Sequence, residues 1–229
     1  MKILAIGAHP DDIEIFMFGL LYNLKRQGCK IYTIVATDGS LGGNFAKEKL
    51  VKIREKEASL GLTKISKPIF LRVPDGSLND NPDHKQNLKI MIDKIEPDVI
   101  VTHHHKDYHS DHIQLSLVVK QIASHYIPII YCDTMMGINF TPNYYVDITS
   151  CFEDKKRAIL CHKSQSPKRF IKLVELMNRY RAAQCNAPEQ NYAEGYYFKP
   201  SFPFSDIRNV LPKSPDLKPF HISKQHGFL

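Results

Sequence analysis

Residues 2–14, KILAIGAHPDDIE, decide the fold of this 229-residue chain. The first seven of them form a short apolar run, whose length and composition are typical of a buried strand. A polar cluster begins where that strand would end. Because the carboxyl ends of the strands form the ligand-binding crevice of an open parallel sheet, the sequence places His9, Asp11 and Asp12 where chemistry normally takes place.

This first polar cluster has both a structural and a functional interpretation. An aspartate after a strand is a common helix N-cap, so Asp11 or Asp12 can cap the next helix, with Glu14 in its first turn. Pro10, however, stiffens the backbone next to His9, which suits a site that holds ligands in a set geometry. Carboxylates crowded together repel one another unless a cation neutralises them, and this favours the functional interpretation.

The pattern of a strand followed by a helix repeats along the first 132 residues. Further strands are expected at 30–37, 68–73, 98–102 and 127–132, and helices at 13–27, 46–61, 83–95 and 111–124. This alternation predicts an α/β fold with a Rossmann-like, mostly parallel, doubly wound sheet that carries helices on both faces. Gly28 is expected to end the first helix.

The remainder of the chain is less regular. Strands are expected at 144–148 and 196–198, and helices at 152–162 and 167–185. From residue 199 onward, repeated prolines interrupt any periodic pattern, at Pro200, Pro203, Pro212, Pro215 and Pro219. We therefore expect a single domain over residues 1–198 and an irregular, partly disordered, Pro-rich C-terminal arm over residues 199–229.

Composition narrows the function classes. Lys plus Arg is 31 and Asp plus Glu is 24, a formal charge of +7, and no basic block has interleaved aromatics, so we expect no nucleic-acid partner. The five cysteines form no CxxC pair, which excludes a thiolate zinc finger and indicates free thiols in a reducing compartment. The N-terminal apolar run is too short for a signal peptide or a membrane span, so we expect a cytoplasmic protein.

A second polar cluster, VTHHHKDYHSDH at residues 101–112, follows the fourth expected strand. Two strand ends of one sheet can supply ligands to a single metal ion, and a set of imidazoles and carboxylates suits zinc, although iron or cobalt fits the same ligands. His112 falls in the first turn of the expected helix and points back to the crevice. His103, His104 and His105 are left out of the ligand set, as loop residues or a weak, adventitious metal site.

With both clusters in place, the chain resembles the LmbE-like, PIG-L family of zinc-dependent N-acetylglucosamine deacetylases. Other segments agree with the family in order along the chain, namely TDG at 37–39, REKEA at 54–58, VDIT at 146–149, HKSQ at 162–165 and YAEGYYF at 192–198. The resemblance spans residues 2–198, which would then be one deacetylase domain. Ser110 stands where the family often has proline, and Ile13 follows Asp12 as in its small-substrate branch; neither departure removes a ligand.

The resemblance implies a role for each site residue. His9, Asp12 and His112 would hold Zn²⁺, and Asp11 would be the general base. His109, oriented by Asp111, would stabilise the oxyanion or protonate the leaving amine, and Arg54 would contact the substrate.

The implied reaction removes the acetyl group from an N-acetylated amino sugar or sugar conjugate and releases acetate and the free amine. The group attached to the sugar stays open. Small members of the family often associate, so the resemblance also allows a homo-oligomer.

Two other functions stay open beside this one. A metal-dependent amidase or deformylase would use the same site on another N-acyl bond. A non-catalytic metal- or nucleotide-binding module is disfavoured, because no GxGxxG follows the first strand and such a module has no need for Asp11 beside the metal. The glycine-rich loop 38–44 either approaches a sugar closely or serves as a flexible connection, and HKSQ either lines the pocket or ends a helix.

Overall fold

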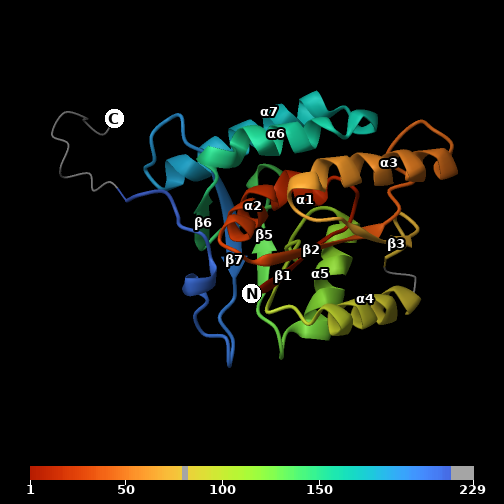
Figure 1. Cartoon of the computed structure of the whole chain (residues 1–229), viewed down its shortest axis with the longest axis horizontal. Coiled ribbons are helices and arrows are strands. Elements are labelled where there is room, and N and C mark those ends of the chain that lie inside the picture. The colour runs from red at the N-terminus through yellow and green to blue at the C-terminus, as the bar shows by residue number, and fades with distance from the viewer. Residues whose placement is uncertain (79–81, 218–229) are drawn as a thin grey trace.

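The computed structural model describes residues 1–78 and 82–217. Within them, one seven-stranded sheet has the order β3-β2-β1-β4-β5-β7-β6 (Figure 1). The strands are β1 (Lys2–Gly7), β2 (Lys30–Thr37), β3 (Ile69–Val73), β4 (Val99–Thr102), β5 (Ile129–Cys132), β6 (Tyr144–Asp147) and β7 (Ala193–Phe198). The first five strands pair in parallel, while β7 pairs antiparallel with both β5 and β6. The predicted mostly parallel, Rossmann-like sheet is therefore confirmed.

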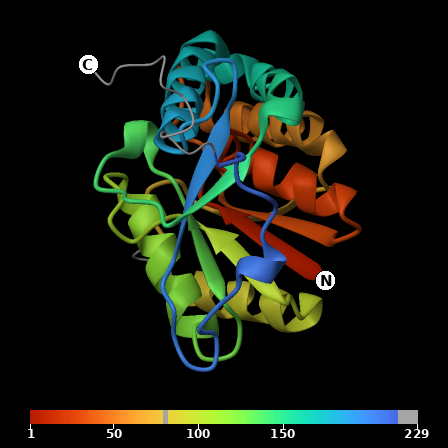
Figure 2. The ribbon, with the colours of Figure 1, turned by 90° about the vertical axis from the view of Figure 1, so that its left-hand side faces the viewer.

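Helices cover both faces of this sheet, as predicted. They are α1 (Asp12–Phe16), α2 (Phe18–Arg26), α3 (Lys47–Gly61), α4 (Pro82–Ile95), α5 (Ser110–Ala123), α6 (Phe152–Leu160) and α7 (Pro167–Gln184). Figure 2 shows α6 and α7 on one side of the sheet and α4 and α5 on the other. None of the helices within the described residues is long and apolar enough to cross a membrane.

The strand residues alternate between two hydrophobic cores. Ile3 and Ala5 of β1 face the core that α1, α2, α6 and α7 cover, whereas Leu4 and Ile6 face the core beneath α4 and α5. A continuous apolar strand is what burial on both faces requires. The carboxyl end of β1 is thereby held at the centre of the sheet, with β2 and β4 on either side.

The first helical segment differs from the prediction of one helix over residues 13–27. It breaks at Met17, whose φ of −129° and ψ of −7° lie outside the helical range. The second helix starts against β7, where the Glu194 carboxylate accepts hydrogen bonds from the N–H groups of Gly19 (2.9 Å) and Leu20 (2.8 Å). A carboxylate at a helix N-terminus satisfies donors that would otherwise lack partners, so a residue far along the chain sets this break.

Of the two caps expected for that segment, the aspartate cap at its start is absent and the glycine at its end is present. Asp11 occupies the N-cap position of α1 but makes no side-chain cap hydrogen bond, and Asp12 Oδ2 instead accepts a hydrogen bond from the His9 N–H at 2.6 Å. Both carboxylates are thus available to the crevice. At the other end, Gly28 follows the C-cap residue of α2 with a φ of +87°, as a helix-ending glycine should.

The Pro-rich segment is irregular, as expected, yet its described part, residues 199–217, packs on the domain. It contains η5 (Arg208–Val210), and Ile207 joins the larger hydrophobic core. The carbonyl of Lys213 accepts a hydrogen bond from the Asp147 N–H at 3.0 Å, which places the segment beside β6. Pro219 lies outside the described residues.

Candidate active site

The two polar clusters meet where β1 and β4 end side by side. Ala8, just after β1, donates its N–H to Nε2 of His103, just after β4, at 3.1 Å. On the other side, the Ala8 carbonyl accepts hydrogen bonds from the N–H and the hydroxyl of Thr37, both at 2.8 Å. Neighbouring strand ends are thus tied together under the site, and the predicted meeting of the clusters is confirmed.

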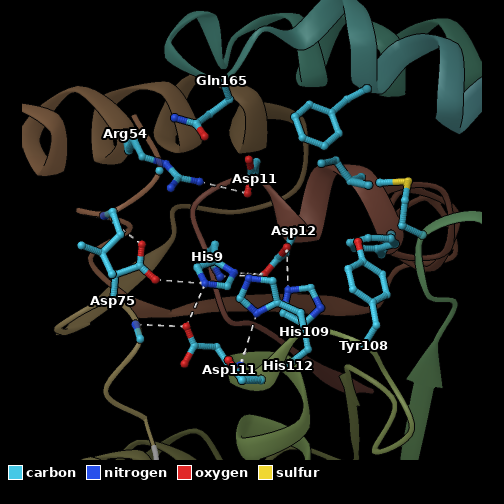
Figure 3. A pocket seen from close by; sticks show the side chains of 18 residues that line it. His9, Asp11, Asp12, Arg54, Asp75, Tyr108, His109, Asp111, His112 and Gln165 are labelled. Atoms are coloured by element: carbon cyan, nitrogen blue, oxygen red, sulfur yellow. Dashed lines mark hydrogen bonds and ion pairs between the residues drawn. The ribbon is translucent and has the colours of Figure 1, made fainter. Parts of the chain in front are cut away.

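The three residues that the resemblance implies as zinc ligands lie together, with Asp12 between the two imidazoles (Figure 3). Asp12 Oδ2 lies 3.4 Å from His9 Nδ1, and Asp12 Oδ1 lies 3.3 Å from His112 Nε2. All three side chains are buried. Burial would raise the pKa of Asp12, but His112 and His103 hold it well below its usual value.

The donor set of this cluster fits a divalent metal ion. Within the described residues, three overlapping groups bring ligand atoms close enough to share one ion: His9, His109 and His112; Asp12, His103 and His112; and His9, Asp75 and Asp111. Imidazole nitrogens and carboxylate oxygens at buried positions are the ligands that zinc uses in catalytic sites. None of the three groups is the implied triad itself, although each of its members belongs to at least one of them.

His103, which the sequence leaves out of the ligand set, lies in the loop after β4 but is part of the buried cluster. Its ring is fully buried, stacks on His112 with centroids 3.7 Å apart, and brings Nε2 to 3.1 Å from Asp12 Oδ2. The same nitrogen faces the Ala8 N–H, so its lone pair is engaged by the backbone. Burial, together with His112, lowers the pKa of His103 to about 4, so its ring is neutral at pH 7.

The other two histidines of that run do lie apart from the three groups. His104 is surrounded by the rings of Tyr131, Phe140 and Tyr197, with centroids 5.1–5.6 Å away. His105 is exposed.

Arg54 contacts the expected base rather than only the open cavity. Its Nη2 lies 3.2 Å from Asp11 Oδ1 and 3.2 Å from the carbonyl of Pro10, and its Nη1 donates to the carbonyl of Gly39 at 3.0 Å. Burial raises the pKa of Asp11, and the Arg54 charge opposes that rise. The guanidinium thus fixes one oxygen of Asp11 and ties the ends of β1 and β2 together.

The expected orientation of His109 by the Asp111 carboxylate is not what the structure shows. Asp111 Oδ2 lies 3.1 Å from His9 Nε2 and accepts a hydrogen bond from the Gly76 N–H at 3.1 Å. His109 is the N-cap of α5, and its Nδ1 accepts the backbone N–H of Asp111 at 3.3 Å. Asp111 therefore orients His9 through its side chain and His109 through its backbone.

Two carboxylates missed by sequence reasoning hold the rings of the implied ligands. Asp107 Oδ2 lies 2.9 Å from His112 Nδ1, and Asp75 Oδ1 lies 3.2 Å from His9 Nε2. Burial would lower the pKa of His112, but Asp12 and Asp107 raise it to about 9. Asp75 follows β3, so the rule that sites gather at strand ends could have found it. No spacing rule singles out Asp107.

A further buried network connects the first cluster with the HKSQ segment. His162 Nε2 lies 2.8 Å from Glu14 Oε1, and the Glu57 carboxylate accepts hydrogen bonds from the N–H and the hydroxyl of Ser164. This network holds η4 (Lys163–Gln165), whose Gln165 lines the cavity. Of the two roles considered for HKSQ, lining the pocket or ending a helix, the structure therefore supports lining the pocket.

A cavity of about 460 Å³ opens over the cluster. Figure 3 shows Arg54 and Gln165 above the histidines on the side of Asp75, with Tyr108 on the opposite side. Leu41 and Gly42 of the glycine-rich loop also line the cavity. A Cβ at Gly42 would lie only 2.4 Å from Arg54 Nη1, so the loop approaches the site as closely as glycine permits. Further apolar lining comes from Ile15, Phe16, Met135 and Phe170.

The chain is similar to a known protein family and to several known proteins. Residues 4–123, more than half of the chain, match the family model PIG-L, described as GlcNAc-PI de-N-acetylase. The chain is 26% identical over 222 residues to diacetylchitobiose deacetylase of Thermococcus kodakarensis, covering 87% of this chain and 83% of that protein. It is 30% identical over 173 residues to the uncharacterized deacetylase YaiS of Escherichia coli, covering 71% of this chain and 90% of that protein.

Solved structures share the fold. N,N'-diacetylchitobiose deacetylase from Pyrococcus horikoshii, in complex with its inhibitor MPG, has a TM-score of 0.74 at 23% identity and covers 86% of this chain and 83% of that chain. GalB, the 4-carboxy-2-hydroxymuconate hydratase of Pseudomonas putida, has a TM-score of 0.76 at 19% identity and covers 86% of this chain and 95% of that chain. Because a hydratase and a deacetylase share this fold, the reaction must be argued from the site.

Proposed function

Because the chain belongs to the PIG-L family, we propose that it is a zinc-dependent hydrolase that removes the acetyl group from an N-acetylated amino sugar. The observation that carries this proposal is the buried Asp12 carboxylate, which lies within 3.4 Å of both His9 and His112, with Asp11 lining the same cavity. A binding module would need the metal ligands but not an additional buried carboxylate held by an arginine. The names of the T. kodakarensis and P. horikoshii proteins support an acetylated amino sugar as the substrate.

The ligand set assigned to zinc is His9 Nδ1, an Asp12 oxygen and His112 Nε2. His9 Nδ1 and His112 Nε2 each lie within 3.4 Å of an Asp12 oxygen. The other ring nitrogens of the two histidines face the carboxylates of Asp75, Asp111 and Asp107. Such outer carboxylates orient imidazole ligands and make them more basic. When bound, zinc lowers the pKa of a coordinated water to about 7 and polarises a carbonyl oxygen.

Asp11 is the general base of this proposal. Arg54 occupies its Oδ1, so Oδ2 is the atom that accepts a proton from the attacking water. A carboxylate whose pKa is raised toward neutrality by burial is a more effective base than an exposed one. The proton then passes from Asp11 to the amine as the C–N bond breaks, giving acetate and the free amino sugar.

His109 is a hydrogen-bond donor to the substrate carbonyl oxygen. Its Nδ1 accepts a backbone N–H, so the neutral ring carries its proton on Nε2. Burial and the neighbouring His112 lower the pKa of His109, which keeps the ring neutral at pH 7. An N–H aimed at the developing oxyanion stabilises the transition state more than the ground state.

Acetate release tests the proposal. The zinc-loaded protein is incubated with a panel of N-acetylglucosamine derivatives, with Asp11→Asn as the control protein. We expect acetate from at least one derivative and its loss in the variant. A protein that holds stoichiometric zinc yet releases no acetate from any of them would exclude this substrate class and favour another N-acyl bond or a different reaction.

A further inference from the structure

One apolar part of the cavity wall comes from a segment that no sequence motif singled out. Residues 133–140 follow β5 and contain η2 (Met135–Gly137), and the side chain of Met135 lines the cavity. Met135 packs against the hydrophobic core that contains Phe16, whose ring lies 6.1 Å from that of His112. An apolar surface therefore borders the metal cluster.

The position of this segment depends on an arginine of α7. Arg181 Nε donates to Asp133 Oδ2 at 2.5 Å, and its Nη2 donates to Asp133 Oδ1 at 3.0 Å. Both residues are buried, and the guanidinium lies near the rings of Phe140 and Tyr180. A two-pronged arginine–carboxylate pair fixes direction as well as distance, so Asp133 is held in one orientation at the start of the segment.

The backbone between Asp133 and Phe140 is folded tightly against that arginine. The Gly137 N–H donates to the Thr134 carbonyl at 2.9 Å, and the Thr134 hydroxyl donates to the Ile138 carbonyl at 2.5 Å. Gly137 has a φ of +70°, and a Cβ there would lie 2.7 Å from Arg181 Nη2. Because hydrogen bonds close the turn from within and Arg181 packs against Gly137 from outside, Met135 has little freedom to move away from the cavity.

The chemistry of an N-acyl amino sugar indicates which end of it meets this wall. The sugar carries hydroxyl groups, which suit the side of the cavity formed by Arg54 and Gln165. The acyl group is its hydrocarbon end, and it gains free energy by leaving water for an apolar surface.

We propose that Met135 determines the length of acyl group that the site accepts, and that Arg181, acting through Asp133, is the residue that positions Met135. This inference rests on the proposed deacylation and adds a specificity-determining residue and a positioning residue to it.

The test uses the N-acetylglucosamine derivative from which the wild type releases acetate, and compares its N-acetyl and N-butanoyl forms. The proteins are the zinc-loaded wild type, Met135→Ala, Arg181→Lys and the double variant. Met135→Ala should raise the ratio of kcat/KM for butanoyl over acetyl about tenfold, since methylene groups in a hydrophobic pocket discriminate by about this factor or more. Arg181→Lys should also raise the butanoyl-to-acetyl ratio of kcat/KM, and the change should appear in KM. The double variant should exceed Met135→Ala by no more than about twofold, because coupled residues are not additive.

Two further variants separate positioning from general damage. Arg179→Lys, two residues earlier on α7 and exposed, changes surface contacts to Glu175 and Tyr192 and should leave the ratio unchanged. Gly137→Ala keeps Arg181 but places a methyl group against its guanidinium. It should therefore shift the ratio in the same direction as Arg181→Lys. This second variant keeps the test available if circular dichroism shows that Arg181→Lys is unfolded.

The outcomes are distinguishable. A wild type that hydrolyses the acetyl sugar while Met135→Ala leaves the ratio unmoved overturns this inference and leaves the proposed function standing. Fully additive effects of Met135→Ala and Arg181→Lys overturn the positioning role of Arg181. A wild type that releases acetate from no derivative of the panel overturns the proposed substrate, and this inference with it.

Discussion

Asp107 Oδ2 lies 2.9 Å from Nδ1 of His112, while Nε2 of the same ring faces Asp12 at 3.3 Å. The two contacts fix both the plane of the imidazole and the nitrogen that it offers to a metal ion. Asp75 and Asp111 do the same for His9 from the other side. The two implied ligands are therefore held in place before any ion binds, which lowers the free-energy cost of assembling the proposed metal site.

Removing the Asp107 charge should weaken metal binding without unfolding the protein. Asp107→Asn is expected to lower zinc affinity about 10- to 100-fold, the usual effect of losing such an orienting carboxylate. Competition with a chromophoric chelator measures the affinity. Asp93→Asn, which changes an exposed pair with Lys89, is the matched control. Equal affinity in the Asp107 and Asp93 variants would contradict the orienting role.

His112 and His103 should differ in their effect on the metal although their rings stack. His112→Gln is expected to abolish stoichiometric zinc, because it removes an implied ligand. His103→Gln should retain one zinc per chain, because the His103 nitrogen that faces Asp12 is already engaged by the Ala8 N–H. Elemental analysis after dialysis measures the zinc content of both variants. Loss of zinc in both would make His103 a ligand.

Replacing the proposed base should separate chemistry from metal binding. Asp11→Asn is expected to lower kcat about 10²- to 10⁴-fold, the contribution typical of general base catalysis, while zinc content stays at wild-type level. The asparagine keeps the shape of the side chain and can still accept from Arg54. Retained kcat in the zinc-loaded variant would remove Asp11 from the mechanism.

Arg54 should matter for catalysis beyond any contact with substrate. Lysine cannot reach Asp11, Gly39 and Pro10 at once, so Arg54→Lys is expected to lower kcat about tenfold or more, as expected for a lost charge-assisted hydrogen bond. Steady-state kinetics separates this from a change in KM. Arg72→Lys, at an exposed pair with Glu55, is the control. A rise in KM alone would leave Arg54 as a substrate-binding residue only.

The parts of the fold that local pattern determines could be predicted from the sequence. Apolar runs such as residues 2–8 and their alternation with helical periodicity are local properties, and they led to the parallel sheet and its two helical layers. The break at Met17 could not be predicted, because the Glu194 carboxylate that starts α2 comes from β7. Packing between distant segments overrides local periodicity at such points.

The site shows the same division. Strand ends in a parallel sheet converge, so the meeting of the two polar clusters could be predicted from the order of the strands. The set His9, Asp12 and His112 came only from the resemblance to the family. The contacts that each side chain makes depend instead on its rotamer and on the path of its loop. The Asp111 carboxylate contacts His9 rather than His109, and the His103 ring points inward and contacts Asp12. Sequence spacing does not encode these choices.

The central claim, one divalent metal held by His9, Asp12 and His112 beside Asp11, is tested most directly by crystallography at the zinc absorption edge. Anomalous difference maps of zinc-loaded crystals should show one strong peak at about 2.0–2.2 Å from nitrogens of His9 and His112 and an oxygen of Asp12, the bond lengths usual for zinc. A peak centred instead among His9, Asp75 and Asp111, or one with His103 in place of His9, would contradict the assigned site and the mechanism built on it.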